Sequence, residues 1–160
     1  LMFSNDVNLA STDLELVEDL GFTQMVGMRF ADVTVPNGAT ITSAWIQFKT
    51  DETSTGGINL SFRGEAADDA ATFADAASNI SARALTAASV TWWPGPWNSV
   101  GAAGPNQQTP DLSPLIQEIV DRPGWAPGNA LVVIISGSGV RIAESFDGDA
   151  AGAPLLHIEY

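Results

Sequence analysis

The sequence predicts an all-β protein, a β-sandwich of the jelly-roll kind with one short helix. Many short segments alternate between apolar and polar residues, which is the pattern of strands with one buried face. Turn-forming residues separate these segments, as in Pro36-Asn37-Gly38. Only residues 112–121 repeat their apolar side chains at helical spacing. No internal repeat or interdomain linker interrupts the pattern, so we expect residues 1–160 to form a single β-sandwich domain.

Each expected strand has its own alternation or apolar run. The expected strands cover residues 26–30, 33–35, 41–49, 58–63, 89–92, 131–136, 141–146 and 155–160. Within 41–49, Ala44, Ile46 and Phe48 share one face and Trp45 lies on the other. Residues 131–136 are apolar on both faces, which predicts a central strand covered from both sides. The Gly-Ser-Gly sequence at 137–139 predicts a hairpin turn.

The single helix is expected over residues 112–121. Its apolar side chains are Leu112, Leu115, Ile116, Ile119 and Val120. Ser113 is the expected cap, with Pro114 at the first helical position and Pro123-Gly124 at the end. We expect the apolar stripe to cover the sandwich rather than to bind a partner. Residues 66–88 are rich in alanine and are expected to form a long loop with a helical turn near 69–73.

The charge balance disfavours several partners. Nineteen Asp and Glu oppose six Lys and Arg, for a net charge of −13. Such a surface repels phosphate backbones, so nucleic acid is not an expected partner. Anionic membranes are disfavoured for the same reason, and no stretch has the length and apolarity of a transmembrane helix. Divalent cations, by contrast, are attracted.

Cysteine and histidine usage narrows the chemistry further. The chain has no cysteine, which excludes disulfides, thiol catalysis and thiolate metal sites. The one histidine, His157, lies in an expected strand, where we interpret it as a surface residue rather than a catalytic base. A glycosidase needs two carboxylates across a cleft. Glu118 and Glu144 are candidates, but nineteen acids make coincidental pairs common. We therefore expect no enzymatic activity.

The composition suits an extracellular bacterial module. Lysine is scarce, Asp, Thr, Ser, Gly and Ala are abundant, and the charge is acidic. The sequence begins abruptly at Leu1-Met2-Phe3, as a module excised from a larger secreted protein would. We therefore expect an extracellular or cell-surface location and further domains in the parent chain.

Three of the five tryptophans lie in the six residues from Trp92 to Trp97. An indole ring is mostly apolar, so such a cluster needs a core to bury it or a ligand to cover it. Alternation from Val90 turns Trp92 into the core. Trp93 and Trp97 lie on the Pro-Gly-Pro turn, where stacking on a sugar ring and loop packing are equally compatible with the pattern.

The remaining tryptophans and several polar residues complete the candidate set. Trp45 is a reserve sugar contact, and Trp125 is an expected packing anchor. Stacking alone binds weakly, so polar groups must fix the sugar hydroxyls. The candidates for this role are Arg29, Asn98, Gln107 and Gln108.

Several segments carry a family resemblance. The runs Val26-Gly27-Met28-Arg29-Phe30, residues 35–44 (VPNGATITSA), Val90-Thr91-Trp92 and residues 111–131 resemble, in order, the motifs of DNRLRE-type domains. The resemblance extends from about Asp13 to Tyr160 and implies a secreted jelly-roll module. Such modules occur in large bacterial surface proteins and beside polysaccharide-degrading domains, and some bind carbohydrate. The sequence departs from the family in the acidic insert at 65–78 and in the doubled Trp92-Trp93.

Two acidic pairs are candidate metal ligands. Asp13 and Glu15 share one strand face, and Asp147 and Asp149 lie in a turn close to the final strand. Calcium takes six to eight oxygen ligands, often from carboxylates and loop carbonyls. The resemblance implies a structural calcium between the first and last strands, which these four residues would fit.

These observations predict a non-catalytic carbohydrate-binding module. Polysaccharide is the expected partner, bound by Trp93 and Trp97 with Trp45 and Arg29, and calcium is the expected cofactor. The alternative is a structural or adhesive module of a bacterial surface protein, without a glycan ligand and with its tryptophans packed.

Overall fold

The computed structural model describes residues 5–160, and within them the chain forms ten strands and one α-helix. The strands are β1 (Asp13–Asp19), β2 (Phe22–Thr23), β3 (Val26–Val33), β4 (Ser43–Gln47), β5 (Thr50–Glu52), β6 (Asn59–Gly64), β7 (Val90–Trp92), β8 (Asn129–Ser138), β9 (Val140–Glu144) and β10 (Leu155–Glu159). The helix is α1 (Ser113–Val120), and a 3-10 turn covers Pro105–Gln107. All strand pairs are antiparallel, which confirms the all-β class with one short helix. Leu1, Met2 and Phe3, where the sequence begins, lie outside the described residues.

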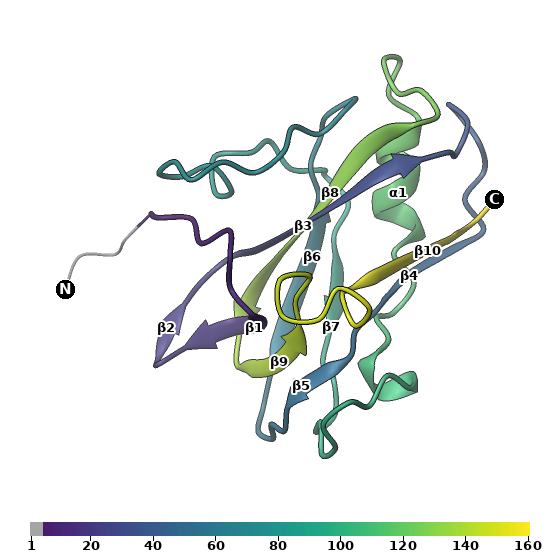
Figure 1. The fold of residues 1–160 in the computed structure, drawn as a ribbon. Coiled ribbons are helices and arrows are strands. Elements are labelled where there is room, and N and C mark those ends of the chain that lie inside the picture. Colours follow the sequence, from purple (N-terminus) through teal and green to yellow (C-terminus); the bar gives the residue numbers. More distant parts are fainter. Residues whose placement is uncertain (1–4) are drawn as a thin grey trace.

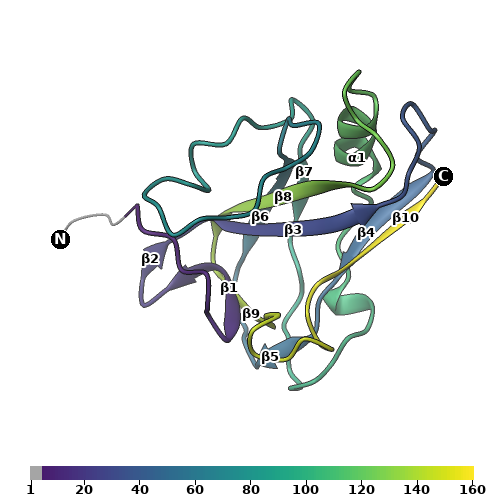
Figure 2. The ribbon, with the colours of Figure 1, turned by 45° about the horizontal axis from the view of Figure 1, so that its top comes forward.

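Two layers of strands enclose the core (Figures 1 and 2). One layer is a four-stranded sheet in the order β3-β8-β6-β7, here the major sheet. The other layer combines the acidic sheet, in the order β2-β1-β9-β5, with the β4–β10 pair. The chain joins these two parts, because β4 leads through Phe48 and Lys49 into β5, and the Glu144 N–H of β9 donates to the Lys49 carbonyl at 2.9 Å. The β-sandwich is confirmed, and the jelly-roll order of its strands stays a prediction.

The core lies between the layers and is built from alternating residues. The major sheet buries Val26, Met28, Leu60, Phe62, Trp92, Leu131, Val133 and Ile135 in it, and the facing layer buries Leu16, Val17, Ala44, Ile46, Phe48 and Ala143. The alternation predicted in 41–49 and 58–63 is therefore confirmed. Helix α1 packs against β4 and β6 and buries Leu115, Ile116, Ile119 and Val120, so its apolar stripe covers the sandwich as expected.

The start of α1 differs from the prediction. Ser113 is the first helical residue, and Leu112 occupies the cap position without a side-chain hydrogen bond. Asp111 lies one residue earlier still, and its carboxylate accepts bonds from the Ser113 N–H at 3.0 Å and the Ser113 hydroxyl at 2.6 Å. The Ala44 N–H donates to the same carboxylate at 2.9 Å, so Asp111 ties the helix start to β4.

The loop between β6 and β7 covers part of the outer face of the major sheet (Figure 2). Ala70 and Phe73 from this loop pack on Val132 and Ile134 of β8, which makes β8 a central strand covered on both sides, as predicted. The fit is close, because a Cβ atom at Gly27 would lie 2.6 Å from the Phe73 ring. The loop contains turns and no helical turn at 69–73, so that expectation is wrong.

The loop is fastened by Arg83. Its guanidinium pairs with Glu65 at 2.7 Å, donates to the carbonyls of Ala71 and Thr72, and lies 4.5 Å from the centre of the Phe73 ring. The Arg83 side chain is 8% exposed, so this is a largely buried ion pair within a satisfied network. A long segment without regular structure thereby holds a defined position.

The glycines at 137–139 do not form the predicted hairpin. β8 pairs with β3 and β6, whereas β9 pairs with β1 and β5, so the chain crosses here from one layer to the other. Gly139 has a φ of +93°, and a Cβ there would lie 2.6 Å from the Gly57 carbonyl oxygen. Glycine is required at this corner for both reasons.

Candidate functional site

The cluster of three tryptophans divides into two buried rings and one exposed ring. Trp92 is 8% exposed, Trp97 is 0% exposed and Trp93 is 68% exposed. The assignment of Trp92 to the core is confirmed. Outside the cluster, Trp125 is a packing anchor as expected, since its Nε1 donates to the Val35 carbonyl at 2.9 Å.

Trp97 is packed, and its assignment as a sugar-binding residue is wrong. Its ring lies 6.3 Å from Phe48 and 6.4 Å from Trp92, centre to centre. Its Nε1 donates to the Asn106 carbonyl at 3.0 Å, and its backbone forms a bridge with Ser54. A ring with no exposed surface offers no face to a ligand.

Trp93 follows β7 on the outer face of the major sheet. The β6 residues Leu60 and Phe62 face the core, so alternation turns Asn59, Ser61 and Arg63 outward. The register pairs Ser61 with Thr91 of β7 and with Ser136 of β8, and pairs Asn59 with Ser138. Continued by one residue, the register places Asn59 opposite the exposed indole, and hydroxyl side chains follow along the same face. We call these seven residues the outer patch: Asn59, Ser61, Arg63, Thr91, Trp93, Ser136 and Ser138.

The turn that carries Trp93 is held by Arg141. This side chain is buried in β9, and its guanidinium donates to the carbonyls of Pro94, Gly95 and Gly56 at 3.0 Å each. It also donates to its own neighbour Val140 at 2.6 Å. Burial lowers the pKa of Arg141, because the charged form loses water. The backbone carbonyls replace that water and fix the turn beneath the outer patch.

The other predicted carbohydrate contacts lie elsewhere. Trp45 is half-buried on the β4–β10 pair and stacks on His157, with ring centres 4.0 Å apart. His157 is exposed on the strand surface, as predicted. Arg29 donates through Nε to the Ala70 carbonyl at 2.9 Å and lines a cleft of about 340 Å³ with Phe30. Neither Trp45 nor Arg29 belongs to the outer patch.

The candidate polar partners are equally dispersed. Gln107 is buried and its side chain accepts a bond from the Gly104 N–H at 3.0 Å, so it supports the 3-10 turn. Gln108 is half-buried and bridges Gln47 of β4. Asn98 is exposed beyond Trp97. The sequence offered no reason to prefer Ser61, Thr91 or Arg63, which only the pairing of β6 with β7 brings onto the same face as Trp93.

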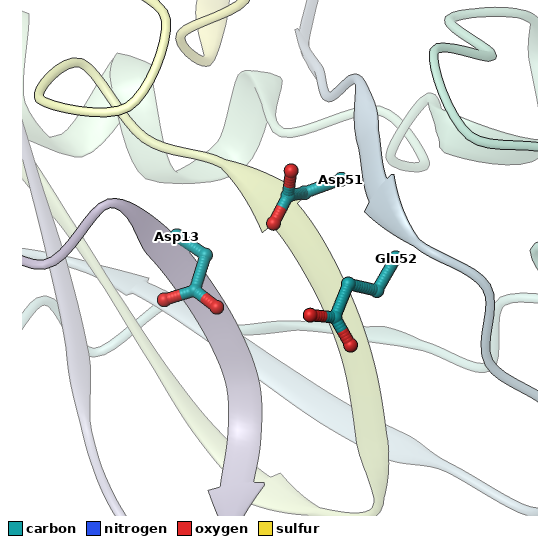
Figure 3. A group of neighbouring side chains, drawn as sticks. All are labelled: Asp13, Asp51 and Glu52. Carbon is teal, nitrogen blue, oxygen red and sulfur yellow. The ribbon is translucent and has the colours of Figure 1, made fainter.

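Three carboxylates converge on the acidic sheet (Figure 3). Asp13 lies on β1, and Asp51 and Glu52 lie on β5; one oxygen from each lies within 4.8 Å of the others. β9 separates the two strands, and its Glu144 pairs in register with Asp13. Several carboxylate oxygens at this spacing form the donor set that a hard divalent cation prefers. Among residues 5–160, this triad is the group of acidic or histidine side chains with metal-binding spacing.

The predicted metal ligands form no such group. Of the four, only Asp13 belongs to the triad. Glu15 accepts a hydrogen bond from Gln24 Nε2 at 3.1 Å, Asp149 pairs with Lys49 at 2.8 Å, and Asp147 is exposed. The four predicted residues therefore do not gather at metal-binding spacing, although Gly148 of the 147–149 turn lies against the Thr12 carbonyl, next to Asp13.

The triad is electrostatically strained by further acids. Burial and the neighbouring Asp51 raise the pKa of Glu144 above its usual range. Lys49 offsets part of this repulsion: its hydrogen bond with Asp149 raises the Lys49 pKa and lowers the Asp149 pKa. The Lys49 ammonium therefore interacts with several carboxylates, and a bound cation would reduce the repulsion that remains among them.

A larger cleft adjoins the cleft at Arg29. It measures about 670 Å³ and is lined by polar residues of the N-terminal segment, β1 and β3, with Asn8, Ser11 and Leu14 shared by both clefts. Asp13 and Glu15 reach its wall, and neither Trp93 nor Arg63 does.

Comparisons with protein-family models, curated proteins and solved structures find no match. No helix in residues 5–160 is long and apolar enough to cross a membrane.

Proposed function

We propose that the protein is a non-catalytic carbohydrate-binding module that holds a polysaccharide on the outer patch. Trp93 carries the proposal, because a 68% exposed indole beside hydroxyl and amide groups is the arrangement that a sugar needs. The apolar indole covers the C–H face of the ring, and the polar side chains bond its hydroxyls.

The uncovered strands favour an extended ligand. Phe73 and the rest of the 65–89 loop cover β8 near Val132, whereas Ser61, Thr91 and Ser136 lie beyond the apolar cluster that the loop buries. Outward side chains on neighbouring strands suit a polymer lying along the strands better than a small molecule, which needs a concave pocket.

Calcium is the cofactor we propose, held by Asp13, Asp51 and Glu52. Its place would be structural: it would tie β1 to β5 across β9 and neutralise the carboxylates there. We further propose a jelly-roll module of a secreted or cell-surface bacterial protein, in line with the resemblance and the acidic composition.

The alternative is a structural or adhesive module without a glycan ligand. The burial of Trp92, Trp97 and Trp125 favours it, since three of the five tryptophans serve packing. The two functions differ in whether Trp93 has a ligand.

A binding screen separates them. Affinity gel electrophoresis with xylan, mannan, β-glucan, polygalacturonate and dextran sulfate, followed by calorimetry, should reveal at least one polymer that retards the protein. Trp93→Ala should lose that retardation and keep the wild-type melting temperature. Trp45→Ala is the matched control and should bind normally. Retardation that survives Trp93→Ala, or none with any polymer, would overturn the proposal.

A further inference from the structure

Five of the six cationic Lys and Arg side chains have a partner. Lys49 pairs with Asp149, Arg83 with Glu65, and Arg122 with Asp68. Arg29 and Arg141 donate to backbone carbonyls. In a chain with nineteen carboxylates, such engagement is expected.

Arg63 is the exception within residues 5–160. It lies half-buried on β6 and forms neither an ion pair nor a hydrogen bond, and its Nε is buried without an acceptor. A buried donor left unpaired costs free energy, so its presence in a native structure calls for an explanation. The two terminal nitrogens of the guanidinium form no hydrogen bond either and are not buried, so they are the donors available to an anion.

The strands around Arg63 carry few acids, and Glu118 of the nearby helix accepts hydrogen bonds from the backbone N–H groups of Ala87 and Ala88. Glu65 follows Arg63 by two residues in the chain, and its carboxylate is already paired with Arg83 at 2.7 Å. No carboxylate occurs on β6, β7 or β8, and the one on β3, Asp32, is exposed. The acidic sheet belongs to the other layer, about 10 Å away for stacked sheets, and the screening length is about 8 Å at physiological ionic strength.

Arg63 and Trp93 lie on the same face at a distance that a polymer can span. Continued by one residue, the register places Trp93 opposite Asn59, four residues from Arg63 along β6. At about 3.4 Å per residue the separation is about 14 Å. Ser61 and Thr91 lie between them as a cross-strand pair. A single sugar ring cannot reach both ends, whereas an oligosaccharide can.

We propose that Arg63 determines specificity by binding an oxyanion of the glycan, a carboxylate or a sulfate ester. Guanidinium binds either group through two parallel N–H···O bonds. Trp93 then provides stacking for the chain, and Arg63 selects its charge. This inference rests on the proposed function and adds the ligand class to it.

Matched polymers test it: polygalacturonate against its full methyl ester, and dextran sulfate against dextran. The full chain should bind the charged member of at least one pair about tenfold more tightly, as expected for a charge-assisted bond. The pair that shows this preference identifies the carboxylate or the sulfate. Monomeric galacturonic acid should show no comparable binding, because it spans only one end of the site.

Variants separate the local contact from net charge. Arg63→Gln should lose the preference and keep the weaker binding of the neutral polymer, and Arg63→Lys should keep part of it. Arg122→Gln removes the same charge from an exposed ion pair elsewhere and should bind like wild type. Equal loss in Arg63→Gln and Arg122→Gln, or equal wild-type binding of both members of each pair, would overturn the role of Arg63 and leave carbohydrate binding standing. Absence of any binding would overturn both.

Discussion

The two sheets share one core but present opposite exteriors. Strands β1, β5 and β9 of the acidic sheet carry seven carboxylates, namely Asp13, Glu15, Glu18, Asp19, Asp51, Glu52 and Glu144, against the single buried Arg141. The four strands of the major sheet carry two arginines and one aspartate. The acids of the major-sheet side lie instead in the loop that covers β8, which carries Glu65, Asp68, Asp69 and Asp75.

This difference teaches that whole-chain charge is a poor guide to the partner of a single face. The acidic sheet brings three carboxylates together, whereas the outer patch on the major sheet offers hydroxyls, an indole and an unpaired guanidinium. Both exteriors depend on one shared element, because Arg141 reaches from β9 to the turn that carries Trp93.

The largest expected change in stability separates Trp93 from Trp97, the two tryptophans at the ends of the Pro-Gly-Pro turn. Trp97→Ala should lower the free energy of unfolding by about 3–5 kcal/mol, because it empties a fully buried site between Phe48 and Trp92. Trp93→Ala should change it by less than about 0.5 kcal/mol. Urea unfolding measures both; similar losses would contradict the division into a packed and an exposed ring.

Arg141 and Arg63 are the corresponding pair of arginines. Arg141→Gln should cost about 3 kcal/mol, since it leaves the carbonyls of Pro94, Gly95 and Gly56 without donors. Arg63→Gln should leave stability nearly unchanged, because it breaks no bond. Thermal unfolding followed by circular dichroism checks this. An Arg141→Gln protein as stable as wild type would show that the turn at Pro94 and Gly95 does not depend on these hydrogen bonds.

Calcium should stabilise the acidic sheet by a comparable amount. At a hundred times its dissociation constant, a ligand adds about 2.7 kcal/mol, or several degrees of melting temperature. Asp51→Asn should abolish the shift between excess calcium and excess chelator, and Asp147→Asn should retain it. An unchanged wild-type melting temperature would remove calcium from the proposal.

The smallest effect is a pH dependence at Glu144. Its pKa in the folded protein is raised above the usual 4.5, so the folded state binds the proton more tightly than the unfolded chain. The stabilisation is complete below about pH 4.5 and is lost as the pH rises through the folded pKa. In chelator, Glu144→Gln should therefore melt about 1 °C higher than wild type at pH 7 and lose this advantage in acid.

Asp149 should show the opposite dependence of stability on pH. Its pKa is lowered by Lys49, so its contribution is present above pH 3.8 and is lost as the pH falls through the folded pKa. Asp149→Asn should melt slightly below wild type at pH 7, and a melting scan from pH 3 to 8 shows both trends. An Asp149→Asn protein as stable as Glu144→Gln would contradict the proposed roles of the two acids.

Local patterns predicted the elements, and distant pairings decided the sites. Alternation was sufficient to place Ala44, Ile46 and Phe48 in the core, because a strand face is a property of the residues next to one another. The burial of Trp97 depends on Asn106 and Ser54, which the sequence does not link to it. The triad likewise forms only because β9 pairs with both β1 and β5.

Pairings between distant residues also decided the role of the segment 137–139 and the environment of Arg63. Gly137-Ser138-Gly139 contains the residues of a hairpin, and only the different partners of β8 and β9 show that it is a corner between sheets. Alternation in 58–63 turned Arg63 outward, but the lack of a partner depends on where all nineteen acids lie.

The loop fastened by Arg83 has a consequence for the size of the ligand. It covers β8 at Val132 and Ile134, where Phe73 and Ala70 pack, so the proposed glycan would have β6, β7 and the Ser136–Ser138 end of β8 open to it. A shorter loop would leave more of the outer face of β8 open, but it would expose Val132 and Ile134. Exposed apolar side chains of this kind promote self-association. The loop therefore sets two properties at once: the extent of the open strand surface and the burial of apolar side chains on β8.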